Sequence, residues 1–260
     1  MKIIDMIDEY RELYFVCLED WSDEMKDAGN KKCQWHDKMQ GRGVRVKLAL
    51  DDTGTVGGMI QYAPIETAFV EGEDLYFVYC IWVHGYKQGR GNFQKQGMGK
   101  ALLAAAESDA RERGAKGMVT WGMSLPFWMQ ASWFKKQGYR KIDKKSVQVL
   151  LWKPFTDTAI APKWIKEKKK PERIPGKVTV TSFVNGWCTA QNIVYERAKR
   201  AAAEFGDKVI FQEIDTFDHR TLLEWGHSDA LFVDGKEVRT GPPPSYEKLR
   251  KLIERRVRRL

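Results

Sequence analysis

The sequence predicts an α/β (α+β) protein with two domains in succession, on the strength of three observations. The 260 residues exceed one typical domain, and a composition of 43% hydrophobic and 30% charged residues is that of a soluble globular protein. Strand patterns alternate with helical patterns along the chain. A stretch with three prolines and a lysine run divides it, so we expect domains at 1–154 and 177–260 with a linker at 155–176.

The first forty residues predict two helices, the second of them after Asn30. The first carries an apolar stripe formed by Tyr10, Leu13, Tyr14, Cys17 and Leu18. Charged residues interrupt the opening segment MKIIDMIDEYREL, so it has no uncharged stretch long enough for a signal peptide or a membrane span. We therefore expect a cytoplasmic protein without a membrane segment.

An antiparallel hairpin is predicted next. Apolar residues at 44, 46, 48 and 50 alternate with Arg45, Lys47 and Ala49, which is typical of a half-buried strand. The turn Asp52-Thr53-Gly54 then leads into a second strand at 56–62.

The stretch from 75 to 114 predicts a strand, a loop and a helix. The run Leu75–Val83 is short, apolar and rich in aromatic and β-branched residues, which indicates a strand buried on both faces. A basic glycine-rich loop follows, and a helix is expected from near Gly99 to a left-handed cap at Gly114. Such a turn points several backbone N–H groups and the positive end of the helix dipole at one place. This arrangement binds phosphate.

Two familiar phosphate loops do not fit these residues. The ATP-binding pattern fails because Ala101 follows Lys100 and because Gln94 replaces the first glycine. The dinucleotide pattern fails because Gln94 also replaces its last glycine. The segment Gln94-Lys95-Gln96-Gly97-Met98-Gly99 instead fits [QR]-x-x-G-x-[GA]. In its place between a buried strand and an amphipathic helix, it resembles the signature of the GNAT superfamily of N-acetyltransferases.

The resemblance implies acetyl-CoA as co-substrate. In that family the fourth strand pairs with the pantetheine arm, which here implies Ile81, Trp82 and Val83. The amides of the loop hold the pyrophosphate, which implies Gln94, Lys95, Gln96, Gly97, Met98, Gly99 and Lys100. A fifth strand, here 117–123, splays away and leaves a cleft, and a first strand would be absent or reduced to a remnant at 2–4.

The family's usual acid and base are not in place. The fourth strand has no glutamate, and Phe134 replaces the tyrosine of a Tyr-x-x-x-Gly-Phe pattern. His84, whose imidazole suits a base at neutral pH, and Cys80 on the same strand face are the candidate catalytic residues. Both residues also fit roles without catalysis, Cys80 as a small buried hydrophobic residue and His84 as a surface residue at the end of the strand. A water chain to the carboxylates just before the strand would serve as well.

A helix that Pro126 opens is expected beyond the fifth strand. Its bulky aromatic residues are Phe127, Trp128, Trp133 and Phe134. They favour a packed core face over a surface for stacking a ligand. A last strand at 147–152 closes the domain, and in the linker Trp164 and Ile165 are candidates to dock.

The second domain has a predicted βαβαββα order. Strands are expected at 177–184 and 209–214, a hairpin of two strands at 230–238 that turns at Asp234-Gly235, and helices before Gly206, at 221–225 and from Ser245. With Trp187-Cys188 at the first strand-to-helix turn, this order resembles thioredoxin. A GNAT domain with such a tail resembles the YoaP-like acetyltransferase family. The second active-site cysteine of thioredoxin is replaced by Gln191, and Ser228-Asp229 stand in place of its cis-proline.

Cys188 has two interpretations of equal weight. At a helix N-terminus the dipole and the free amides favour a thiolate, and so a single reactive thiol. Alternatively, Cys188 is a relic in a domain kept for packing or for binding a partner. Without a thiol at 191, we expect no reduction of disulfides by the thioredoxin route.

Charge and cysteine usage narrow the partners. Much of the net charge of +9 lies in 166–170 and in 250–259. The basic residues around the glycine-rich loop are explained by the phosphates of CoA. We therefore do not expect nucleic acid as a partner. Four scattered cysteines predict neither a disulfide framework nor a metal site.

We interpret the chain as an acetyl-CoA-dependent N-acetyltransferase. In this interpretation an unidentified small-molecule or peptide amine attacks the thioester of acetyl-CoA directly. The alternative is a degenerate module that binds acyl-CoA or a partner, with Cys188 as a single thiol. The oligomeric state stays open.

Overall fold

The computed structural model describes residues 1–125 and 128–260. The chain divides into two compact units, the first made of Met1–Ser22 and His36–Trp164, the second of Asp23–Trp35 and Ile165–Leu260. Helix α2 (Asp23–Gln40) therefore contributes to both units. The boundaries 1–154, 155–176 and 177–260 stay a prediction, and they place this helix in the first domain alone. The predicted roles of Pro126 and Phe127 lie outside the described residues.

A seven-stranded sheet runs through the first unit in the order β1-β2-β3-β5-β6-β8-β7. Its strands are β1 (Lys2–Asp5), β2 (Arg45–Leu50), β3 (Val56–Pro64), β5 (Leu75–Val83), β6 (Gly117–Met123), β7 (Arg140–Lys145) and β8 (Gln148–Pro154). Only β5 and β6 are parallel neighbours among these strands. The bounds predicted for β5 and β6 are confirmed, and β1 is the short strand expected near 2–4. The polar strand β7 was not predicted.

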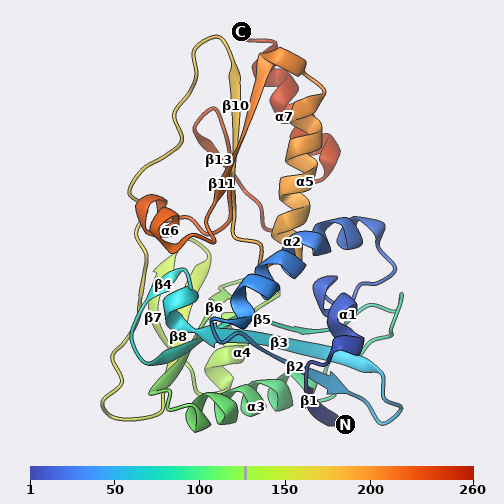
Figure 1. Ribbon diagram of the computed structural model, residues 1–260, viewed down its shortest axis with the longest axis vertical. Coiled ribbons are helices and arrows are strands. Elements are labelled where there is room, and N and C mark those ends of the chain that lie inside the picture. Colours follow the sequence, from blue (N-terminus) through green and yellow to red (C-terminus); the bar gives the residue numbers. More distant parts are fainter. Residues whose placement is uncertain (126–127) are drawn as a thin grey trace. The chain divides into compact units, whose positions relative to one another are not determined.

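Two helices lie on opposite faces of this sheet (Figure 1), α3 (Met98–Glu112) on one and α1 (Arg11–Phe15) on the other. On the α3 face, the Tyr62 hydroxyl donates to Asp109 of α3 at 2.7 Å. On the α1 face, the Tyr14 hydroxyl donates to Gln61 at 2.6 Å. Neighbouring residues of β3 thus face different helices, as the pleat requires. We call the second face the α1 face.

The predicted helices near the N-terminus need correction. The first ends at Phe15, because Cys17 and Leu18 take positive φ angles of 51° and 66°, which no helix accommodates. The second begins at Asp23 and not after Asn30. Its polar first turns show little apolar pattern, so the sequence pattern placed its start too late.

Smaller elements complete the first unit. They are two 3-10 turns (Asp8–Tyr10 and Ile65–Thr67), the helix α4 (Ala131–Lys136) and the paired strands β4 (Val70–Glu71) and β9 (Lys163–Trp164). Phe134 of α4 is fully buried, as the packed-core interpretation predicted. Trp164 stacks on Phe69 with ring centroids 6.2 Å apart, and Ile165 is buried, so both candidate linker residues pack.

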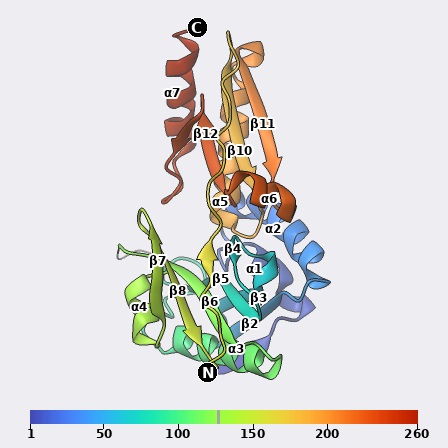
Figure 2. The ribbon, with the colours of Figure 1, turned by 90° about the vertical axis from the view of Figure 1, so that its left-hand side faces the viewer.

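The second unit has a four-stranded sheet in the order β11-β10-β12-β13. The elements are β10 (Val178–Val184), α5 (Thr189–Ala203), a 3-10 turn (Gly206–Lys208), β11 (Val209–Asp215), α6 (His219–Trp225), β12 (Ala230–Val233), β13 (Lys236–Val238) and α7 (Tyr246–Val257). Helices α5 and α7 pack on one face of the sheet, and α6 lies at the other (Figure 2). There Trp225 of α6 packs on Phe183. The βαβαββα order is as predicted, and the likeness to thioredoxin stays a prediction. No helix in the described ranges is long and apolar enough to cross a membrane.

Candidate functional site

Strand β5 loses regular pairing on both sides near its middle. Toward β3, Gln61 pairs with Cys80 and Tyr62 pairs with Val78, so Tyr79 forms a bulge. Toward β6, parallel pairing ends at Val78 and Thr120. The carboxyl-terminal halves of β5 and β6 therefore diverge, as the resemblance implied for these strands.

Side chains fill the space where the two strands diverge. The indole N–H of Trp121 donates to the carbonyl of Tyr79 at 2.9 Å. The amide of Ile81 donates to the sulfur of Met129 at 3.5 Å, and Met129 is only 5% exposed. Met129 takes a positive φ of 54°, an unusual conformation for a residue other than glycine. The Ile81 amide, which the resemblance assigns to the pantetheine arm, is therefore covered by Met129 here.

The loop after β5 ends at the N-terminus of α3. Gly97 caps the helix with a left-handed φ of 87°, and no atom lies within 4 Å of the Cβ that another residue would add there. The amides of Met98, Gly99 and Lys100 lie in the first turn, where a helix offers them no acceptor. Gly97 and Lys100 are exposed. This N-terminus can therefore bind an anion by backbone donors and the helix dipole.

Hydrogen bonds within the loop fix the residues before the helix. The Gln94 amide donates to the Asn92 side chain at 3.0 Å, and the Gln96 side chain donates to the Asn92 carbonyl at 3.0 Å. The Gln94 side chain also reaches the Val83 carbonyl at 3.5 Å. The predicted loop residues from Gln94 to Lys100 thus lie together after β5, and Lys95 and Lys100 are exposed cations beside the helix N-terminus.

His84 lies fully buried at the end of β5. Its Nδ1 lies 2.5 Å from the carbonyl oxygen of Gly91. A carbonyl only accepts, so Nδ1 carries the proton in this bond and the neutral ring presents Nε2 as an acceptor. Nε2 is buried and has no hydrogen-bond partner among the described residues. A histidine fixed in this tautomer is equipped to accept a proton at Nε2.

Cys80 lies on the α1 face opposite Gln61, beside the bulge. It is buried, and it lies near the Tyr14 hydroxyl, whose pKa is raised well above its ordinary value by burial and further by the charges of Cys17 and Cys80. Cys80 and His84, four residues apart and both buried, therefore share one strand face.

Cys188 belongs to the second unit and caps the N-terminus of α5. It is only 6% exposed. Next to it, the Trp187 indole donates to Asp229 at 2.8 Å, and the Asn185 amide donates to the same carboxyl at 3.2 Å. Burial raises the pKa of Asp229 to about 6, against the effect of these hydrogen bonds. The turn is packed, which favours the structural interpretation of Cys188. Its redox role stays a prediction.

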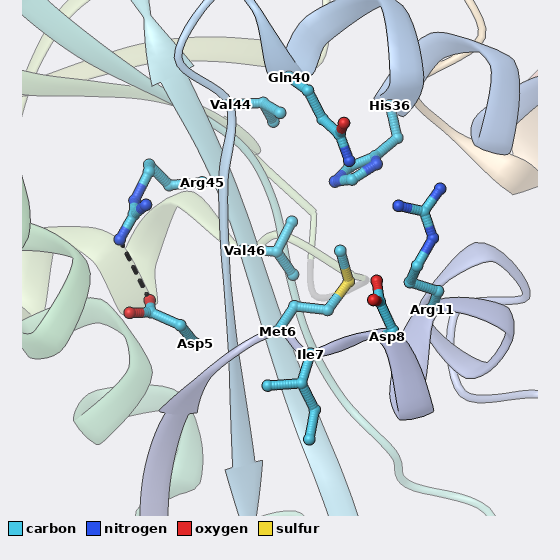
Figure 3. A pocket seen from close by; sticks show the side chains of 10 residues that line it. All are labelled: Asp5, Met6, Ile7, Asp8, Arg11, His36, Gln40, Val44, Arg45 and Val46. Carbon is cyan, nitrogen blue, oxygen red and sulfur yellow. Dashed lines mark hydrogen bonds and ion pairs between the residues drawn. The ribbon is translucent and has the colours of Figure 1, made fainter.

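A cavity of about 400 Å³ lies at the sheet edge, where β1 ends and β2 begins (Figure 3). It is lined by Asp5, Met6, Ile7, Asp8, Arg11, His36, Gln40, Val44, Arg45 and Val46. Val46 pairs with Gln61, which in turn pairs with Cys80. Strand β3 therefore lies between Val46, which lines the cavity, and Cys80 of β5. Nothing in the sequence pattern pointed to it, because its lining comes from four separate segments.

Comparisons with known proteins agree with this geometry. Residues 3–126 match the family model described as the acetyltransferase (GNAT) family. No curated protein matches the chain. The first unit thus has a GNAT-like fold within a mixed α/β protein, and acyl transfer is the chemistry of the family it resembles.

Solved structures of 16–18% identity are similar to the chain. Ribosomal-protein-alanine N-acetyltransferase from Brucella melitensis has 18% identity and a TM-score of 0.46 over 60% of this chain and 100% of that one. PaiA N-acetyltransferase from Thermoplasma acidophilum in complex with coenzyme A has 16% identity and a TM-score of 0.44 over 60% and 100%. A GNAT family acetyltransferase from Brucella melitensis in complex with acetyl-CoA has 16% identity and a TM-score of 0.41 over 63% and 94%.

Proposed function

We propose that the first unit transfers an acetyl group from acetyl-CoA to a small-molecule or peptide amine, by direct attack of the amine. One observation carries most weight. An exposed helix N-terminus with a glycine cap directly follows a strand that diverges from its parallel neighbour. This pair of features lies within the stretch that matches the GNAT family model. The proposed location is the cytoplasm.

The loop residues fit the phosphates of acetyl-CoA. Gly97 leaves space for close approach, and the amides from Gln96 to Lys100 are proposed to bind the pyrophosphate. On β5, the residues proposed to pair with the pantetheine arm are Ile81, Trp82 and Val83, which lie beyond the last residue that pairs with β6. Contact with Ile81 requires Met129 to move aside.

His84 is the proposed base. Acetyl-CoA supplies an acetyl thioester, and transfer replaces its C–S bond by a C–N bond while the amine gives up a proton. The Gly91 carbonyl holds the Nδ1 proton of His84, so Nε2 is free to take the proton of the amine. Cys80, on the same strand face, is the second candidate and would serve as the acid for the leaving thiolate.

Release of free thiol from acetyl-CoA tests the proposal. Purified full-length protein is mixed with acetyl-CoA and a panel of amines, aminoglycosides, polyamines and peptides. The free thiol of the released CoA is measured by the absorbance of a chromogenic thiol reagent. We expect release only with the right amine. For that amine His84→Gln should lower kcat by about 100-fold or more, the usual contribution of a positioned base. Full kcat in His84→Gln from about pH 6 to 9 would exclude the histidine as base.

The second candidate function is a binding module, favoured by the contact of Met129 with the Ile81 amide. In that case the first unit binds acyl-CoA or a partner without turnover, and Cys188 is a single thiol of the second unit. Calorimetry that shows CoA binding, together with no thiol release for any amine of the panel, would favour this function.

A further inference from the structure

The cavity at the edge of the seven-stranded sheet has an apolar wall. That part of its lining is formed by Met6, Ile7, Val44 and Val46. Ile7 is 50% exposed, so the lining presents apolar surface to water that a ligand would cover. All ten lining residues belong to the first unit. The volume of about 400 Å³ lies near the lower end of the range for small-molecule sites, so the cavity suits a small organic molecule.

Two of the charged lining residues neutralise each other. The guanidinium of Arg45 lies 3.4 Å from a carboxylate oxygen of Asp5. It also lies 3.3 Å from a carboxylate oxygen of Asp109 on α3. The carboxylate and the guanidinium that are left for a ligand therefore belong to Asp8 and Arg11.

Asp8 and Arg11 lie on the same side of one helical turn. The amide of Arg11 donates to the carbonyl of Asp8 in a 3-10 turn, in which side chains three residues apart eclipse each other. Figure 3 shows both side chains pointing into the cavity. The exposed Asp8 carboxylate has no ion pair or hydrogen bond among the described residues. The cavity thus presents two opposite charges close together, and the negative one is open to a cation.

The Arg11 guanidinium is fixed in position by its surroundings. It donates to Asp37 at 2.6 Å and lies over the Phe15 ring, 5.4 Å from the ring centroid. His36, which also lines the cavity, packs edge to face on Phe15 with ring centroids 5.7 Å apart. A guanidinium has five N–H donors, so Arg11 can bind Asp37 and the carboxylate of a ligand at the same time.

We propose that the cavity binds a zwitterionic α-amino acid with an apolar side chain. The ammonium group is bound by the Asp8 carboxylate, and the α-carboxylate is bound by the Arg11 guanidinium. The side chain of the ligand contacts Val44 and Val46 and covers Ile7. An α-amino acid carries both of its charges on one carbon atom, which matches two opposite charges from one helical turn. A ligand with a single charge binds only one of these two residues.

This cavity is separate from the proposed site of acetyl transfer. Strand β3 lies between Val46, which lines the cavity, and Cys80 of β5. Among the described residues, none of those proposed to bind CoA or to move a proton lines the cavity. The bound amino acid is therefore not the acceptor of the acetyl group, and the inference does not rest on the proposed function.

Binding of L-leucine in the absence of acetyl-CoA tests the inference. L-Leucine is titrated into the full-length protein and followed by calorimetry. The matched probes are 4-methylpentanoate, which lacks the ammonium group, 3-methylbutylamine, which lacks the carboxylate, and glycine, which lacks the apolar side chain. We expect leucine to bind at least tenfold more tightly than each of the three. An affinity for any of them equal to that for leucine, or no binding of leucine, would overturn the inference.

Two variants assign each charge of the ligand to its residue. Asp8→Asn should weaken leucine binding about tenfold and leave the affinity for 4-methylpentanoate unchanged, because that probe has no ammonium group. Arg11→Gln should weaken leucine binding about tenfold and leave the affinity for 3-methylbutylamine unchanged, because that probe has no carboxylate. A residue that only supports the fold would change the affinities for all the probes alike.

Glu9→Gln is the matched control for the carboxylate. Glu9 is exposed in the same 3-10 turn as Asp8 but does not line the cavity, so its variant should bind leucine as the wild type does. Unchanged leucine affinity in Asp8→Asn, with the fold intact by circular dichroism, would overturn the inference. An equal loss of leucine affinity in Glu9→Gln and Asp8→Asn would overturn it as well.

Discussion

Each unit contains a strand that turns into a helix N-terminus, and the two turns have opposite surroundings. Before α3, the loop residues Gln94–Gly97 are exposed, and so is Lys100 in the first turn of the helix. Before α5, every residue from Asn185 to Thr189 is buried. The same local geometry is therefore exposed in one unit, where we propose the phosphate site, and packed in the other. A helix N-terminus is a binding site only when nothing in the fold covers it.

Helix α2 covers the second turn. Gly186, with a φ of 101°, lies so close to α2 that an added Cβ would come within 3.1 Å of both the Lys31 carbonyl and the Trp35 side chain. The Asn192 side chain donates to the Ala28 carbonyl at 3.2 Å. The guanidinium of Arg197 makes two hydrogen bonds to Glu24, at 2.6 and 2.5 Å. The turn that resembles a redox site is thus closed by a helix of the same unit.

The largest expected effect is at the open turn, with Gly99→Asp. A carboxylate about 5 Å from the pyrophosphate costs about 3 kcal/mol at an effective dielectric constant of about 20. CoA affinity should therefore fall by about 100-fold or more. An added Cβ lies 3.4 Å from Trp133, an ordinary contact, so Gly99→Ala and the neutral isostere Gly99→Asn are matched controls. Calorimetry that gives equal CoA affinity for the Asp and Asn variants would contradict the loop assignment.

The packed turn should respond to pH through Asp229. Its pKa is raised from 3.8 to about 6, so its contribution to stability is fully present below pH 3.8 and is lost as the pH rises through 6. A shift of about two units corresponds to at most about 3 kcal/mol. Asp229→Asn removes this titration. Urea unfolding from about pH 4 to 7 should show wild-type stability falling relative to the variant. A constant difference across that range would refute the assignment.

The cover on the packed turn can be disturbed with Gly186→Ala. The variant combines a strained φ with a close contact to α2. We therefore expect the free energy of unfolding to fall by about 2 kcal/mol and Cys188 to be alkylated faster. Gly176→Ala is the matched control, because Gly176 has a φ of 70° but no atom within 4 Å of an added Cβ. In the wild type, mass spectrometry should find Cys17 and Cys33 labelled before Cys188. Early labelling of Cys188 would restore the case for a reactive thiol.

The smallest effect is expected at Met129, which restricts the open site. Met129→Ala frees the Ile81 amide and should raise CoA affinity a few-fold, because a hydrogen bond to a thioether is weak. Met129→Leu fills the same space and should bring no gain. Identical CoA affinities in the two variants would show that Met129 does not compete with the ligand.

The pattern of residues predicted the buried elements best. Leu75–Val83 was assigned correctly because a short run of aromatic and β-branched residues fits a strand buried on both faces. The edge strand Arg140–Lys145 was missed because most of its side chains are charged and exposed, which leaves no apolar alternation. The bulge at Tyr79 was equally hidden, since a continuous apolar run shows no change of phase where the register shifts.

The site was predictable only where glycines mark it. Gly97 and Gly99 pointed to the proposed loop, because a close approach of backbone to phosphate favours glycine. Trp21 lies more than sixty residues before His84, and only the folded chain brings the two rings together. The same holds for Met129, whose sulfur reaches β5 from beyond the fifth strand.

The division of α2 between the units has a consequence during synthesis. Asp23–Trp35 leaves the ribosome early, but the rest of its unit begins at Ile165, about 130 residues later. At roughly 5–20 residues per second, that interval is on the order of ten seconds. Met25 and Trp35, which are buried in the folded protein, therefore stay without their packing partners for that time. A nascent chain stalled before residue 165 should therefore recruit chaperones through this helix, and a truncated gene for 165–260 should yield a unit whose Cys188 turn lacks its cover.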